Sequence, residues 1–285
     1  MLSYQRFSRN LTKGDDNMNR KILDQHVHTN FSPDADSKAT MEDYIRKAKT
    51  LNLPGIIFTD HVDMDTPVEL FHTYPDYAHY ATKIKTLNQP DFFVRMGVEI
   101  GYQPHLKDAL SRFLSTHAFD FVICSMHIGD GLDFYNGDFF AGKTQKEAYQ
   151  RYFELVFDSV TTYKDYDVYG HLDYIIRYGG YKDQSYDYND YSTLIDAILK
   201  TIIKNGKGIE LNTSGLRYNL SVTHPTSSIL KRYKDLGGTI ITLGSDAHAV
   251  DDYYADFDQA KVLLLDAGFT HITEFKQRKP YFVAL

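Results

Sequence analysis

Six short groups of histidine, aspartate and glutamate residues follow apolar runs along this chain of 285 residues, at points where strands are expected to end. They are His26-Val27-His28, Thr59-Asp60-His61, Gly97-Val98-Glu99, Ser125-Met126-His127, Gly170-His171 and Ser245-Asp246-Ala247-His248. A fold that ends many strands in imidazoles and carboxylates directs those side chains to one place. The pattern favours parallel strands that share an edge, and metal-dependent hydrolysis as the chemistry at that edge.

Apolar runs and amphipathic segments alternate along the chain and predict strands and helices in turn. Strands are expected to lead into His26 and to run over 55–59, 92–100, 119–125, 167–171, 208–212 and 239–244. Helices are expected over 41–51, 74–87, 106–115, 143–163, 191–204, 226–236 and 253–267. Seven strand–helix repeats with apolar strands predict a parallel α/β sheet covered by helices.

Two arrangements of such a sheet differ in where they gather polar side chains. A doubly wound sheet collects ligands at one crevice, whereas a barrel delivers residues from every strand to one face. Because ligand residues follow at least six strands here, the pattern favours a seven-stranded TIM-like barrel. No linker rich in Pro, Gly or Ser divides the chain, so we expect a single catalytic domain over 20–285 after a loose polar tail at 1–19.

The balance of charge limits the partners of the protein. A formal net charge of -7 argues against a nucleic-acid polymer, because binding such a polymer takes clustered Lys and Arg. A small phosphorylated substrate held by one or two arginines remains compatible with this charge. No run is long and apolar enough to span a bilayer, and the first twenty residues are polar. We therefore expect no membrane partner, no signal peptide and a cytoplasmic location.

The spacing within the groups suits metal ligands. His26 and His28 are two residues apart, so both face the same side of an extended strand and one metal can take both. Asp246 and His248 repeat this spacing. Glu99 lies in a strand expected to be buried, where a cation would offset its charge, and its two oxygens can bridge two metals. Nitrogen and oxygen ligands of this kind suit zinc, manganese or iron.

Other ionisable residues are expected to play structural roles. Taken alone, each spaced pair also fits half-buried side chains bonded to their neighbours. Three aspartates are expected to orient neighbouring groups rather than bind metal: Asp24, Asp60 and Asp173. Five histidines in helices or loops are expected at the surface or in helix packing: His72, His79, His105, His117 and His271. His224, in a loop before a proline, is left without a role.

In this order the six groups resemble those of the polymerase-and-histidinol-phosphatase (PHP) superfamily of metal-dependent phosphoesterases, over residues 22 to about 250. The resemblance implies a distorted seven-stranded (β/α)7 barrel with three divalent metal ions. The first metal would take His26, His28, Glu99 and Asp246, the second Glu99, His127 and His171, and the third His61, His248 and Asp34. Asp34 stands where many members have a histidine, and Asp36 is a nearby competitor for the role.

Within the superfamily, the segments 170–179 and 210–217 look most like those of stand-alone histidinol-phosphate phosphatases. This resemblance implies hydrolysis of L-histidinol phosphate, a step of histidine biosynthesis, by a water that the metals bridged by Glu99 acidify. Catalytic roles are implied for Glu99, Asp246, His248 and Arg217. Arg217 is the first choice for a bidentate clamp on the substrate phosphate, and Arg177 is the second.

Three other functions remain open from the sequence. A phosphoesterase of the same superfamily that acts on nucleotides or oligonucleotide ends would share the ligands, and the 23 tyrosines would stack on a base as readily as on an imidazole. A non-catalytic metal-binding barrel would show missing ligands, and every ligand position here holds a competent residue. An amidohydrolase would usually have a carboxylated lysine at a strand end, and no lysine here is an evident candidate.

Overall fold

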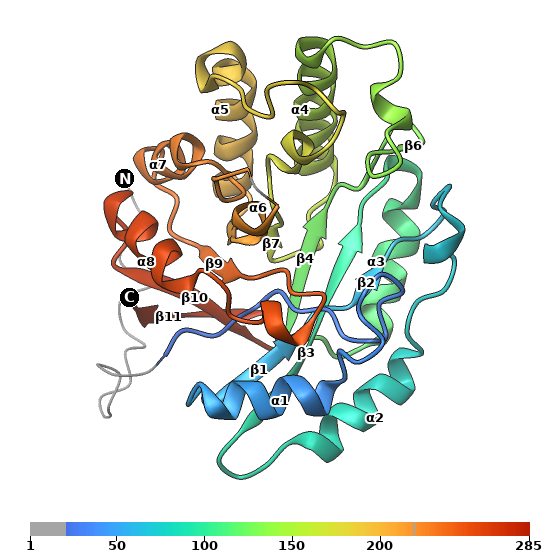
Figure 1. The fold of residues 1–285 in the computed structure, drawn as a ribbon, viewed down its shortest axis with the longest axis vertical. Coiled ribbons are helices and arrows are strands. Elements are labelled where there is room, and N and C mark those ends of the chain that lie inside the picture. Colours follow the sequence, from blue (N-terminus) through green and yellow to red (C-terminus); the bar gives the residue numbers. More distant parts are fainter. Residues whose placement is uncertain (1–20, 219) are drawn as a thin grey trace.

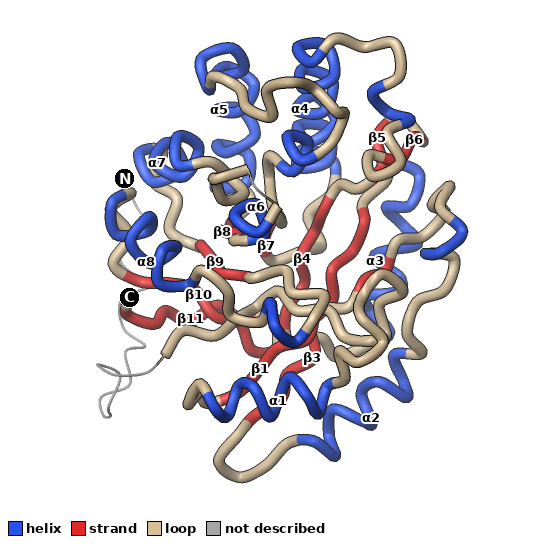
Figure 2. Tube along the Cα trace, in the orientation of Figure 1, coloured by secondary structure: helices blue, strands red, loops and turns tan. Residues whose placement is uncertain are grey.

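The computed structural model describes residues 21–218 and 220–285, so the tail expected at 1–19 lies outside the described residues. Within them, strands and helices alternate up to α8 and are followed by a C-terminal hairpin. The helices lie around the outside of a curled sheet (Figure 1), and the strands are enclosed by them (Figure 2). None of the helices in this part of the chain has both the length and the apolar character needed to cross a membrane.

Seven parallel strands form the main sheet. They are β1 (Gly55–Phe58), β2 (His61–Val62), β3 (Phe93–Gly101), β4 (Phe121–Ser125), β7 (Val168–Tyr169), β8 (Gly208–Asn212) and β9 (Ile241–Gly244). Both β1 and β2 pair with β3, and the sheet continues through β4, β7 and β8 to β9. Because sequential strands lie side by side and run parallel, their carboxyl ends meet at one edge.

An extended segment at 22–28 connects the two outer strands of this sheet. On the β9 side, the backbone N–H of His28 donates to the carbonyl of Ala247 at 2.9 Å. On the β1 side, the N–H of Thr59 donates to the carbonyl of Val27 at 2.9 Å. The pairing with β9 is one isolated bridge between Val27 and Ala247 rather than a regular ladder. The predicted TIM-like barrel is confirmed in a distorted form, and its predicted first strand is this bridged segment.

The helices occupy the predicted places with small shifts at their ends. They are α1 (Met41–Thr50), α2 (Tyr77–Leu87), α3 (Lys107–Thr116), α4 (Gln145–Thr162), α5 (Tyr188–Lys204), α7 (Ser227–Asp235) and α8 (Phe257–Asp266). The predicted second helix begins later than expected because the Asp76 side chain caps it by accepting from the N–H of Ala78. A capping box between Thr144 and Glu147 starts α4.

Short helical turns follow several strand ends and shape the edge where the ligands gather. They are η2 (Glu69–Phe71), η3 (Pro104–Leu106), η4 (Asp138–Phe140), η5 (Tyr174–Arg177), α6 (Ser214–Arg217) and η6 (Val250–Asp252). The predicted last helix is shorter than expected because a turn at 253–256, which follows η6, occupies its first residues. These turns place additional side chains beside the strand ends. The alternation of strands and helices in the sequence does not predict the positions of those side chains.

Strand side chains alternate between two buried layers, as successive residues of a strand must. Ile56 and Phe58 pack into the large core beneath the outer helices. Ile57, between them, belongs to a second cluster with Phe121, Val168 and other strand residues. This second cluster fills the inside of the barrel away from the ligand edge.

Two antiparallel hairpins are not predicted by the alternating pattern. The first joins β5 (Ile128–Gly129) to β6 (Leu132–Asp133) and begins directly after His127. The second joins β10 (His271–Lys276) to β11 (Lys279–Ala284), and its Phe275 ring stacks on Phe121 of the inner cluster at 5.0 Å. The first hairpin therefore extends the ligand edge, whereas the second covers the inner cluster.

Candidate metal centre

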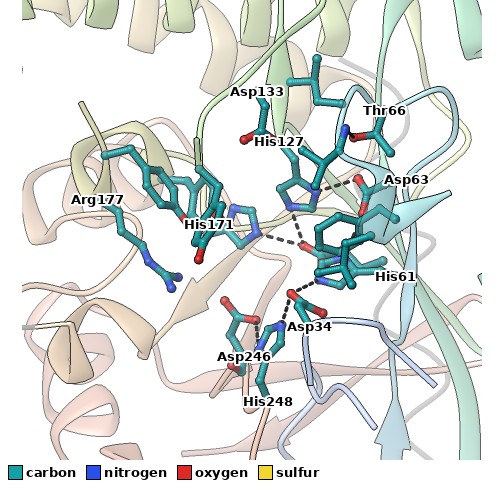
Figure 3. Close-up of a pocket in the computed structure, with 18 of the residues that line it drawn as sticks. Asp34, His61, Asp63, Thr66, His127, Asp133, His171, Arg177, Asp246 and His248 are labelled. Atoms are coloured by element: carbon teal, nitrogen blue, oxygen red, sulfur yellow. Dashed lines mark hydrogen bonds and ion pairs between the residues drawn. The ribbon is translucent and has the colours of Figure 1, made fainter. Parts of the chain in front are cut away.

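The strand ends bring the predicted ligands to one pocket of about 280 Å³ (Figure 3). Seven of them line it: Asp34, His61, Glu99, His127, His171, Asp246 and His248. The other two, His26 and His28, are fully buried and contact the lining carboxylates. All nine side chains proposed from the sequence therefore meet at the same edge of the barrel.

Glu99 on β3 lies between two pairs of histidines. Its Oε2 is 3.2 Å from Nε2 of His26 and 3.4 Å from Nε2 of His28. Its Oε1 is 2.9 Å from Nε2 of His171 and 3.5 Å from Nε2 of His127. Nδ1 of His61 also lies 3.0 Å from Oε2. The two carboxylate oxygens thus face different histidines, which is the arrangement that a ligand shared by two metals requires.

The electrostatics of the pocket keep Glu99 ionised. Burial alone would raise the pKa of this carboxyl group, but the neighbouring His26, His61 and His127 hold its pKa well below the usual range. The hydroxyl of Ser125 donates to Oε1 of Glu99 at 2.6 Å, which also favours the charged form. A divalent cation would replace the protons on these imidazoles, because neutral imidazole and ionised carboxylate are the forms that bind metals.

Asp246 adds a second buried carboxylate beside the first histidine pair. Its Oδ1 lies 3.6 Å from Nε2 of His26 and 3.4 Å from Nε2 of His28. The φ angle of Asp246 is 56°, in the left-handed region that few residues other than glycine adopt. Such strained residues cluster at functional sites. Here the strained residue belongs to the turn that carries Asp246 and His248 from β9 into the pocket.

Asp34 reaches the pocket from the loop that follows His28. Its Oδ2 lies 3.0 Å from Nε2 of His248 and 3.6 Å from Nε2 of His61. Burial opposes ionisation, but these two imidazoles hold the pKa of Asp34 well below its usual range. The competitor Asp36 is not among the residues that line the pocket, and its side chain accepts from the backbone N–H of Lys38.

Several buried atoms at this edge have no hydrogen bond within residues 21–218 and 220–285. They are Nε2 of His26 and His28, Nδ1 of His61, Oδ2 of Asp63 and Oε2 of Glu99. Buried polar atoms are normally hydrogen-bonded, whereas these atoms meet one another only as ion pairs at 3.0–3.4 Å, so they suit a cation shared between them. Three-ligand groups with atoms within 4.8 Å of one another are His26–His28–Asp246, Glu99–His127–His171, His28–His61–His248 and His61–Asp63–His127. The residues therefore fit divalent metal ions such as zinc, manganese or iron.

Two carboxylates that the sequence pattern does not single out hold ligand histidines from behind. Glu210 on β8 places Oε1 2.6 Å from Nδ1 of His26, and Asp63 places Oδ1 2.8 Å from Nδ1 of His127. Occupying one ring nitrogen fixes the direction of the other. Both carboxylates have a signal in the sequence, since Asp63 follows His61 at the spacing of the ligand pairs and Glu210 is a charged residue inside an apolar strand.

The three aspartates expected to orient their neighbours do so. Asp60 accepts from the backbone N–H of Thr29 at 2.7 Å and from the hydroxyl of Tyr80 at 2.6 Å. Asp24 accepts from both the backbone and the side chain of Ser245, beside Asp246. Asp173 lies 2.9 Å from Nδ1 of His224, so the unassigned histidine is a buried partner of this aspartate. The five other histidines lie outside the pocket lining, as expected: His72, His79, His105, His117 and His271.

The two predicted arginines occupy different positions. Arg177 on η5 lines the pocket, and its guanidinium lies 3.3 Å from the ring centroid of Tyr218. Arg217 at the end of α6 is not a lining residue, because its Nη2 donates to the backbone carbonyls of Ser245 at 2.6 Å and Asp246 at 3.1 Å. The structure thus places Arg177 at the pocket wall, while Arg217 braces the turn that carries Asp246.

A distorted barrel that gathers histidines and carboxylates at its strand ends is a metal-dependent hydrolase barrel. Its family is defined by the PHP domain, whose model matches residues 24–214, and the chain belongs to this family. Asp246 and His248 lie beyond the matched range, so it is the structure that joins them to the other ligands.

Close relatives cover almost the whole chain. It is 31% identical over 262 residues to the histidinol-phosphatase of Lactococcus lactis, spanning 91% of this chain and 96% of that protein. It is 34% identical over 241 residues to a protein of Clostridium acetobutylicum named as a probable histidinol-phosphatase, spanning 84% and 91%. The crystal structure of histidinol phosphate phosphatase from Lactococcus lactis, complexed with zinc, L-histidinol and phosphate, matches with a TM-score of 0.84 at 29% identity, over 92% of this chain and 99% of that chain.

Proposed function

We propose that this enzyme hydrolyses L-histidinol phosphate to L-histidinol and phosphate, a step of histidine biosynthesis. The observation that carries the proposal is Glu99, which lies between two histidine pairs in a pocket that also contains Arg177. This arrangement suits metal-assisted hydrolysis of a phosphate ester. The identity of the ester is supported by the relatives named as histidinol-phosphatases and by the Lactococcus structure that contains L-histidinol and phosphate.

Three divalent ions per chain are proposed. The first would be held by His26, His28, Glu99 and Asp246, the second by Glu99, His127 and His171, and the third by His61, His248 and Asp34. Zinc is bound by the Lactococcus relative, and manganese or iron would fit the same donors. When bound, such ions acidify a water molecule and neutralise charge on the phosphoryl oxygens.

The side chains at the pocket wall divide the remaining work. Arg177 binds the phosphoryl oxygens with its guanidinium, which stacking on Tyr218 holds in place. Arg217 acts as a positioning residue, because it binds the backbone carbonyl of Asp246 and so fixes the turn that presents that carboxylate. Glu99, Asp246 and His248 are the catalytic residues in the sense that they hold the metals against the reacting phosphate.

The size and charge of the protein favour a small substrate. A pocket of about 280 Å³ holds a phosphorylated amino alcohol but not a folded polymer. With a net charge of -7, the protein lacks the excess of Lys and Arg that binding to a nucleic-acid polymer needs. Nucleoside monophosphates are small enough to compete as substrates, so they belong in the test.

The test is release of inorganic phosphate from L-histidinol phosphate, beside a panel of nucleoside monophosphates, by protein whose bound metals have been counted. We expect efficient turnover of L-histidinol phosphate alone. Turnover of a nucleotide without turnover of L-histidinol phosphate would support metal-assisted hydrolysis of a phosphate ester but show that the proposed substrate is wrong. No turnover of either at full metal loading would overturn the assignment as a phosphatase.

A further inference from the structure

Two charged side chains line the pocket but are neither proposed metal ligands nor bonded to the second ring nitrogen of a ligand histidine. They are Asp133 at the end of β6 and Arg177 on η5. Figure 3 shows them on different sides of the ligand histidines, with Asp133 beside His127 and Arg177 on the far side of His171. The pocket therefore has a cationic group, Arg177, on one side of the proposed metal centre and an anionic group, Asp133, on the other. Arg177 suits a phosphate, whereas Asp133 has no role in the reaction described so far.

The surroundings of Asp133 give it no ion-paired Lys, Arg or His among the described residues. The side chain is buried at 6% exposure, and its Oδ1 accepts from the backbone N–H of Asn136 at 2.7 Å. Burial raises the pKa of Asp133, while the N–H of Asn136 and the nearby imidazole of His127, a proposed metal ligand, act in the opposite direction. Asp130 on the same hairpin differs, because Arg151 donates to both of its oxygens at 2.7 and 2.9 Å. A buried carboxylate that faces a cavity without a cation is suited to receive one from a ligand.

The hairpin holds Asp133 at a fixed place relative to the metal ligands. Its partner across the β5–β6 pair is Ile128, which directly follows His127 and also lines the pocket. The backbone N–H of Phe134 donates to the carbonyl of His127 at 3.3 Å, and the Phe134 ring is fully buried. Because this anchor adjoins a ligand, a group bound by Asp133 stays close to the reacting centre.

Aromatic and apolar side chains also line the pocket. Tyr135, two residues after Asp133, is 77% exposed, and its ring meets that of Tyr178 edge to face at 6.2 Å. Val68, Leu70 and Phe71 also line the pocket. Aromatic rings in the same pocket as a carboxylate favour an organic cation such as an ammonium or imidazolium over a hydrated metal ion.

We infer that Asp133 is the residue that selects substrates carrying an organic cation, by pairing with the ammonium or imidazolium group while the phosphate binds at Arg177 and the metals. The inference rests on the proposed function for the position of the phosphate. It makes the β5–β6 hairpin the specificity element of the pocket. Phosphomonoesters of amino alcohols are then the preferred class, and neutral esters are poor substrates.

The test compares the wild type with Asp133→Asn on three phosphomonoesters. These are L-histidinol phosphate and O-phosphoethanolamine, which carry a cation, and p-nitrophenyl phosphate, which does not. The ratio of kcat/KM for a cationic ester to that for the neutral ester should fall roughly 10- to 100-fold in the variant, as expected for loss of one charge-assisted hydrogen bond. The inhibition constant of L-histidinol should rise by a similar factor while bound metal stays constant. Asp130→Asn, on the same hairpin but outside the pocket, is the control. It should change neither the ratio of kcat/KM values nor the inhibition constant of L-histidinol.

Each other outcome has a definite meaning. Equal losses on cationic and neutral esters, or no loss on either, would overturn the role of Asp133. If the wild type fails on L-histidinol phosphate but prefers O-phosphoethanolamine, and Asp133→Asn removes that preference, the proposed substrate is wrong and Asp133 is still the selecting residue.

Discussion

Nδ1 of His26 lies 2.6 Å from Oε1 of Glu210, although 184 positions of sequence separate them. The other oxygen of Glu210 accepts from the backbone N–H of His171 at 3.0 Å and from the side-chain amide of Asn212 at 3.1 Å. One carboxylate on β8 therefore fixes two ligands that come from opposite sides of the barrel. Its influence on metal binding is exerted without any contact with the metals themselves.

Glu210→Gln should weaken binding at the first metal site by roughly 10- to 100-fold, because a neutral amide no longer orients and polarises His26. The measurement is metal content after competition with a graded series of chelators. Glu154→Gln, at a partly exposed carboxylate on α4 that pairs with Arg151, is the matched control. Unchanged retention in the Glu210 variant would show that the His26–Glu210 contact is a packing feature alone.

Glu99→Gln should remove both metals that Glu99 would bridge and abolish turnover. The amide keeps the shape of the side chain but has one neutral oxygen. Each of the two proposed metals needs a charged oxygen beside its histidines. Metal analysis of the purified variant, with circular dichroism to confirm the fold, is the measurement. Wild-type activity would rule out a bridging role.

Asp34→Ala should lower the metal stoichiometry by about one ion per chain, because His61 and His248 lose their shared carboxylate. Asp36→Ala is the control, since Asp36 lies in the same loop and faces solvent. If the two variants retain the same amount of metal as the wild type, Asp34 is not a ligand.

Gly101→Ala should reduce metal retention through Asp63. A Cβ at position 101 would overlap Oδ1 of Asp63, the oxygen that faces Nδ1 of His127. The informative design is a double-mutant cycle with Asp63→Ala, read out as metal affinity. The glycine substitution should have little further effect once Asp63 is absent. Additive losses would mean that the alanine acts on the fold rather than on Asp63.

Arg177→Lys should raise KM for the phosphate ester roughly tenfold or more with metal content unchanged, because an ammonium cannot reproduce a stacked, bidentate guanidinium. Arg217→Lys should instead reduce metal retention, since the turn bearing Asp246 loses its brace. Steady-state kinetics and metal analysis on both variants separate the roles. A raised KM in Arg217→Lys with reduced metal retention in Arg177→Lys would instead mean that Arg217 binds the phosphate.

The arrangement of the ligands was accessible from the sequence because it depends on local features. Each group lies within a few residues of a buried strand, and parallel strands in chain order must deliver their ends to one edge. The five histidines around Glu99 follow from that rule. The rule does not say which of the two arginines faces the pocket, because the short turns after the strands determine the direction of each guanidinium.

The remaining features depend on contacts that a linear pattern does not display. Asp63, Asp133 and Glu210 acquire their roles from partners on other strands or from the edge of a cavity. The C-terminal hairpin turns at Gln277 and Arg278, with φ angles of 51° and 58°. Hairpin turns of this conformation usually contain Asn or Gly, so this one lacks the expected signal.

The bridge between Val27 and Ala247 joins the beginning and the end of the barrel. A chain emerging from the ribosome presents His26 and His28 first, and it acquires Asp246 and His248 only when nearly the whole domain has been made. The proposed first metal group is therefore completed only late in synthesis, and a product that stops before β9 would lack Asp246 while keeping His26, His28 and Glu99.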